Sequence, residues 1–130
     1  MYLFYAFPLY IFKFFKNIKP NIWAAFLFAA IFTLFDYLRG TLFGGFPWLV
    51  LGYAQTNNLF LKDFLPFFGV YFLSFLSFFI AALLALSIIK KSALYIVPMI
   101  LIFALGFLAG FIEWTQPVEK PLSVDRKSVV

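Results

Sequence analysis

The chain lacks two residue types that carry much of protein chemistry: its 130 residues include no cysteine and no histidine. Without cysteine, the chain can form neither a disulfide nor a thiolate metal site, and it offers no cysteine nucleophile. Without histidine, it has no imidazole, the side chain that most often acts as a general base. Any chemistry would have to come from Asp, Glu, Lys, Ser or Tyr. We therefore expect no catalysis by these residues alone, and no metal or cofactor.

Charge is also scarce. Only 12% of the residues are charged and 65% are hydrophobic, and the mean hydropathy is +1.03, whereas a soluble domain has about 25% charged residues. This composition argues against a water-soluble fold. The net charge of +5 does not indicate nucleic-acid binding, because the basic residues are not clustered among polar ones but lie between apolar runs.

Four apolar stretches can be drawn, over residues 1–15, 21–38, 66–89 and 93–112. A helix that crosses a bilayer needs about 20 such residues, so the first stretch, which contains Lys13 and ends before Lys16, is short. We predict an all-α, polytopic membrane helix bundle over residues 1–114 with about four transmembrane segments. No soluble domain is expected, since residues 115–130 form only a short polar tail.

The two short connections between these stretches are purely basic. Their charged residues are Lys13, Lys16, Lys19, Lys90 and Lys91. Because cytoplasmic loops are enriched in Lys and Arg, we expect both connections on the cytoplasmic side. The long loop 39–65 and the tail 115–130 would then face the opposite side.

Asp36 and Arg39 lie one helical turn apart at the end of the second stretch, so their side chains can meet on one face of a helix. A charge at membrane depth is costly unless it is paired or reaches water, and such residues are functional candidates. The alternative is an interfacial pair that only ends the span. The sequence leaves both interpretations open.

Five positions after Arg39 begins the run Gly44-Gly45-Phe46-Pro47-Trp48. Glycine permits positive φ, proline fixes its own φ, and aromatic rings favour the headgroup region. Tyr53 and Gln55 add groups that could hydrogen-bond to lipid headgroups or to a partner domain. A loop that simply returns the chain to the membrane would need the same residues.

The motifs of this region, taken together, resemble a known family. They are Leu38-Arg39-Gly40, Gly45-Phe46-Pro47-Trp48 and Gly52-Tyr53-Ala54-Gln55, followed by Leu65-Pro66, Gly69-Val70-Tyr71 and Trp114-Thr115-Gln116-Pro117. At this spacing they are similar to the membrane region of bacterial apolipoprotein N-acyltransferases. The resemblance covers most of the chain, loosely before residue 21 and well over residues 36–86.

The resemblance implies a multi-pass protein of the bacterial inner membrane, with the loop 39–65 and the tail on the periplasmic side. Family members carry a nitrilase-like domain whose Glu-Lys-Cys triad takes an acyl chain from a phospholipid and transfers it to the diacylglyceryl-cysteine of an apolipoprotein. The partners would thus be a phospholipid donor, an apolipoprotein acceptor and membrane lipids. None of the triad positions occurs in these 130 residues, so we expect a fragment that is inactive alone.

For a complete enzyme, we expect the loop to help form the mouth through which lipid-bearing substrates enter. The candidate residues are Arg39, Phe46, Pro47, Trp48, Tyr53 and Gln55, with Asp36 and Arg39 as a structural charge pair. The main alternative is a small non-enzymatic membrane scaffold or complex subunit. A transporter fragment is a third possibility, which the absence of evident ion sites disfavours. Oligomeric state is left open.

Overall fold

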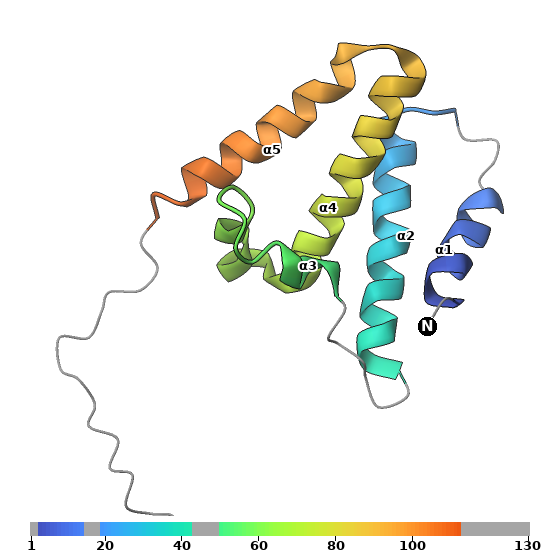
Figure 1. Cartoon of the computed structure of the whole chain (residues 1–130), viewed down its shortest axis with the longest axis horizontal. Coiled ribbons are helices and arrows are strands. Elements are labelled where there is room, and N and C mark those ends of the chain that lie inside the picture. Colours follow the sequence, from blue (N-terminus) through green and yellow to red (C-terminus); the bar gives the residue numbers. More distant parts are fainter. Residues whose placement is uncertain (1–2, 15–18, 43–49, 113–130) are drawn as a thin grey trace, which may run out of the picture.

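The computed structural model describes residues 3–14, 19–42 and 50–112, and all regular structure in these ranges is helical. The elements are α1 (Leu3–Phe14), α2 (Ile22–Thr41), α3 (Leu51–Ala54), η3 (Lys62–Phe64), α4 (Leu65–Lys90), η4 (Ala93–Tyr95) and α5 (Ile96–Ala109). Helices α2 and α4 run side by side at the centre, while α1 lies against α2 and α5 diverges from α4 (Figure 1). The all-helical prediction is confirmed for this part of the chain.

Helix α2 begins where the sequence predicts a span. The side chain of Asn21 accepts a hydrogen bond from the backbone N–H of Ala24 at 3.1 Å, which satisfies one of the N–H groups that a helix start leaves open. The helix continues to Thr41, so the long connection starts later than the predicted residue 39. Its 20 residues give a length of about 30 Å, enough to cross the apolar part of a bilayer.

Helix α4 contains a break close to its start. Pro66 lies in the first turn, where its missing N–H costs no hydrogen bond. Gly69 then adopts φ 74° and ψ 178°, a conformation that is essentially limited to glycine. The predicted span 66–89 is therefore a short turn followed by a regular helix from Val70 to Lys90.

Two of the helices are long and apolar enough to cross a membrane, judged by length and composition: α2, and α4 together with η3 over Lys62–Lys90. The apolar helix over Ala93–Ala109 is shorter than a full span, and α1 has only 12 residues. The expectation of about four transmembrane segments is thus confirmed only as an apolar helical region with two helices of spanning length.

The interior and the exterior of the bundle are both apolar. Leu73 and Leu83 are fully buried between the helices, whereas Trp23, Ile88 and Leu94 are each more than 70% exposed. Soluble monomers rarely expose contiguous apolar surface on this scale. This surface fits a hydrocarbon environment.

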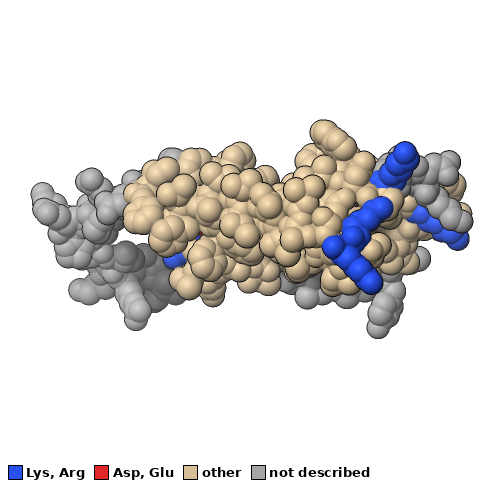
Figure 2. Space-filling view, turned by 90° about the horizontal axis from the view of Figure 1, so that it is seen from above, with Lys and Arg blue, Asp and Glu red and all other residues tan. Residues whose placement is uncertain are grey.

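The helix ends that flank the connections expected to be cytoplasmic lie toward the same end of the bundle. The start of α2 and the turn from α4 to α5 lie toward the top of Figure 1, and the end of α1 lies lower, beside α2. Figure 2, which views the molecule from that side, shows lysine side chains gathered over one part of the face. Among the residues drawn in colour there, no Asp or Glu is visible.

The described part of the predicted loop 39–65 is partly helical, and its last residues, around η3, pack against α5. A Cβ atom added to Gly106 would lie 1.7 Å from the carbonyl oxygen of Phe60, and one added to Gly110 would lie 2.8 Å from a carboxylate oxygen of Asp63. The spacing of these two glycines therefore serves contact with the segment that leads into η3. Because Gly106 has no side chain, the backbone of α5 can approach the backbone at Phe60 closely.

We predict that Gly106→Ala destabilises the chain by about 1–3 kcal/mol through overpacking against the Phe60 carbonyl. The effect should appear even though alanine has a helix propensity about 1 kcal/mol better than that of glycine. Gly110→Ala is the matched control, because it meets the end of a side chain that can move aside. SDS-induced unfolding followed by tryptophan fluorescence measures both variants. Equal stability of the two would contradict the assigned contact.

Candidate functional site

The centre of the candidate site is a buried ion pair near the C-terminal end of α2. Arg39 Nη2 donates to Asp36 Oδ1 at 2.6 Å, and the two residues are only 5% (Asp36) and 4% (Arg39) exposed. Arginine at this end of a helix is also favoured by the helix dipole. The expected i, i+3 contact is therefore present, but in the interior of the bundle and not at its surface.

The guanidinium of Arg39 also binds α1. Its Nη1 donates to the hydroxyl of Tyr5 at 2.8 Å, and its Cζ lies 5.6 Å from the centre of the Tyr5 ring. Phe7 of α1 stacks on Phe35 of α2, with ring centroids 6.2 Å apart, and this contact holds the same part of α1 in place. The short first helix is thus attached to α2 by both polar and aromatic contacts.

The second carboxylate oxygen of Asp36 binds the connection and α4. It accepts hydrogen bonds from the backbone N–H of Leu51 and from the hydroxyl of Ser74, both at 3.1 Å. Ser74 in turn accepts from the backbone N–H of Gly52 at 2.8 Å. The start of α3 therefore has its free N–H groups satisfied by side chains of α2 and α4.

Close backbone packing seats α3 against α4. A Cβ on Gly52 would lie 1.9 Å from the carbonyl oxygen of Val70, so only glycine fits at this position. Between α2 and α4, a Cβ on Gly40 would lie 2.6 Å from the Tyr71 hydroxyl. These two glycines belong to the motifs that flank the connection, and their role here is to let α3 and α4 approach α2 and each other.

The predicted site residues differ in their burial, and three of them are not described by the structure. Arg39 is buried in the network described above, whereas Tyr53 is 52% exposed on α3. Gln55, directly after α3, accepts a hydrogen bond from the Asn58 amide at 3.1 Å. Phe46, Pro47 and Trp48 lie outside the described residues.

Three members of the network could not be found by motif spacing alone. Tyr5 lies 34 residues before Arg39, and Ser74 lies 38 residues after Asp36. Leu51 contributes a backbone N–H, which carries no sequence signal. The one available hint was Ser74 itself, a polar residue inside an apolar span, where hydroxyls bond across helices.

The arrangement anchors neighbouring elements to one another through a single carboxylate. The carboxylate of Asp36 accepts from a guanidinium, a hydroxyl and a backbone N–H, which compensates its burial. Within the ranges that the structure describes, no three His, Cys, Asp or Glu residues gather as metal ligands. The network joins the C-terminal part of α2 to the start of α3.

These features define an apolar, all-helical bundle of the type that fits a bilayer, with a buried charge network at the base of one connection. Comparison with known proteins then gives the family. Residues 1–83 match the apolipoprotein N-acyltransferase N-terminal domain, and the chain belongs to this family.

Named relatives agree with this assignment. An apolipoprotein N-acyltransferase of Coxiella burnetii is 38% identical over 115 residues, which are 85% of this chain and 24% of the relative. That of Nitrosomonas europaea is 41% identical over 97 residues, 74% of this chain and 20% of the relative. That of Ralstonia nicotianae is 35% identical over 102 residues, which are 78% of this chain and 19% of the relative. The chain thus spans a quarter or less of each relative's length.

We predict that Asp36→Asn destabilises the fold by about 3–5 kcal/mol, because it leaves the buried Arg39 charge without its counter-ion. Ser74→Ala should cost less, about 1–3 kcal/mol, for the loss of a buried hydrogen-bonding group. The control is Asp63→Asn, which changes another carboxylate that forms no ion pair with a described residue. Unfolding in SDS measures all three; an Asp36→Asn variant as stable as Asp63→Asn would refute the role of the pair.

Proposed function

We propose that this chain is the membrane portion of an apolipoprotein N-acyltransferase, which transfers an acyl chain from a phospholipid to the N-terminal diacylglyceryl-cysteine of apolipoproteins. The observation that carries the proposal is the family match over residues 1–83. Within that range lies the network of Asp36, Arg39 and Ser74. This network binds the start of α3, next to the connection in which the family motifs are concentrated.

The proposed location is the bacterial inner membrane, with the chain crossing several times. The helix ends that flank the two lysine-bearing connections lie toward one end of the bundle (Figure 1), as expected if both connections are cytoplasmic. The Asp36–Arg39 network lies at the other end, so the connection after Thr41 and the residues after 112 would face the periplasm. Phospholipid and apolipoprotein would be met on that side.

The connection after α2 is proposed to guide the lipid-bearing substrates. Tyr53 is exposed, and the motif Phe46-Pro47-Trp48 precedes it in the sequence. Aromatic side chains favour the headgroup level of a bilayer. Arg39 is buried, which supports a positioning role at the end of α2 in place of direct contact with lipid.

The acyl-transfer chemistry itself is proposed to come from outside these 130 residues. They include no Cys, and the family resemblance implies a Cys nucleophile supported by Glu and Lys. We therefore propose that this polypeptide alone transfers no acyl chain. Membership of the family favours this interpretation over a non-enzymatic scaffold or a transporter fragment.

A chimera tests the proposed function. The corresponding segment of the Coxiella burnetii relative would be replaced by residues 1–112 of this chain, and transfer of an acyl group to a diacylglyceryl-cysteine peptide would be measured. We expect the chimera to retain transfer, whereas the relative with the segment deleted should have none. A chimera that folds and inserts in the membrane but transfers nothing would refute the proposal.

The loop's role is tested in the same chimera with Trp48→Ala and Tyr53→Ala. We expect each change to lower kcat/KM about tenfold, equivalent to ~1.4 kcal/mol of transition-state stabilisation. Leu59→Ala is the control, because Leu59 is 72% exposed on the same connection but outside the motifs. Kinetics unchanged in all three variants would exclude a role of these aromatic residues in substrate access.

A further inference from the structure

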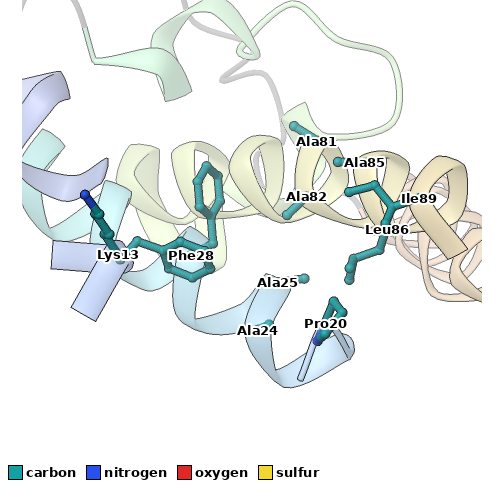
Figure 3. Close-up of a pocket in the computed structure, with 11 residues that line it drawn as sticks. Lys13, Pro20, Ala24, Ala25, Phe28, Ala81, Ala82, Ala85, Leu86 and Ile89 are labelled. Atoms are coloured by element: carbon teal, nitrogen blue, oxygen red, sulfur yellow. The ribbon is translucent and has the colours of Figure 1, made fainter. Parts of the chain in front are cut away.

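A groove lies at the end of the bundle opposite the charge network. Its volume is about 530 Å³, and it is bounded by the end of α1, the start of α2 and the end of α4. Five alanines, three of them on α4, contribute to its walls. Figure 3 shows Ala24 and Ala25 of α2 across from Ala82 of α4, with open space between them.

The walls are almost entirely hydrocarbon, but one edge is charged. Lys13 lines this edge, and its ammonium points away from the alanines (Figure 3). Two more lysines are sequence neighbours of lining residues: Lys19 directly precedes Pro20, and Lys90 directly follows Ile89. Within the described ranges none of these three lysines forms an ion pair, so their charge is available to an anion.

The size of the groove fits a small or elongated ligand. Its volume falls in the range of about 300–1,000 Å³ that is usual for small-molecule sites, and a hydrocarbon chain could fill it lengthwise.

We propose that this groove is a binding site for an anionic phospholipid. One acyl chain lies between the alanines of α2 and α4, and the headgroup phosphate meets Lys13 at the edge. The alanines leave room for the chain, while the lysines distinguish an anionic lipid from the zwitterionic lipids around it. This site is separate from the Asp36 network and does not depend on the proposed acyl transfer.

Native mass spectrometry of the 130-residue chain in a delipidating detergent tests the proposal. The chain is titrated with dioleoyl phosphatidylglycerol or with dioleoyl phosphatidylcholine, which have the same acyl chains. We expect phosphatidylglycerol to bind about tenfold more tightly. Lys13→Gln should lower its affinity about fivefold, which corresponds to ~1 kcal/mol per lysine, and should leave binding of phosphatidylcholine unchanged.

Ala85→Leu tests the hydrocarbon part, because it places a larger side chain in the groove at a position that is exposed in the fold. It should weaken both lipids at least tenfold. The controls are Ala104→Leu on the exposed surface of α5 and Lys62→Gln at the other end of the bundle, which should bind as the unchanged chain does. Far-UV circular dichroism and size-exclusion chromatography verify that each variant is folded.

Three results would overturn the proposal. Equal affinity for the two lipids would show that the lysines do not select the headgroup. Equal binding by Ala85→Leu and Ala104→Leu would show that the lipid lies elsewhere. Dimers that are lost only in the Ala85→Leu variant, without selective lipid binding, would identify a second copy of this chain as the occupant.

Discussion

The carboxylate of Asp36 imposes the constraint on which the rest of this fold depends. A charge in an apolar interior is tolerated only when every acceptor position is satisfied, and one residue cannot satisfy them all. The partners come from Arg39 of the same helix, Ser74 of α4 and the backbone of Leu51. Through Arg39 the network extends to Tyr5 of α1. One charge therefore determines how four helices meet.

Much of the helical framework could be predicted because its signals are local. Asn21 caps α2 through a residue only three positions away, and the lysines that end the apolar runs are visible without any tertiary information. Composition likewise predicts an apolar exterior. The break at Gly69 was not predicted, because glycine is common in membrane helices and its sequence context does not distinguish a positive φ from close packing.

The site was predictable only where its members are neighbours in sequence. The i, i+3 spacing of Asp36 and Arg39 indicates their contact, but not their burial, which depends on α1 and α4 covering them. Ser74 is a partner across 38 residues, and no periodicity encodes that distance. Gly106 presents a similar case: its spacing from Gly110 suggests a helix interface, whereas the surface it meets is the backbone at Phe60.

The separation of Asp36 and Ser74 also has a consequence for biosynthesis. At about 5–20 residues per second, the ribosome needs roughly 2–8 s to add the 38 residues between them. During this interval α2 has Arg39 as its own counter-ion, but the Ser74 hydroxyl does not yet exist. The i, i+3 arrangement means that the charge is neutralised within the nascent helix as soon as that turn forms. When α4 arrives, Ser74 adds its hydrogen bond to an Asp36–Arg39 pair that has already formed.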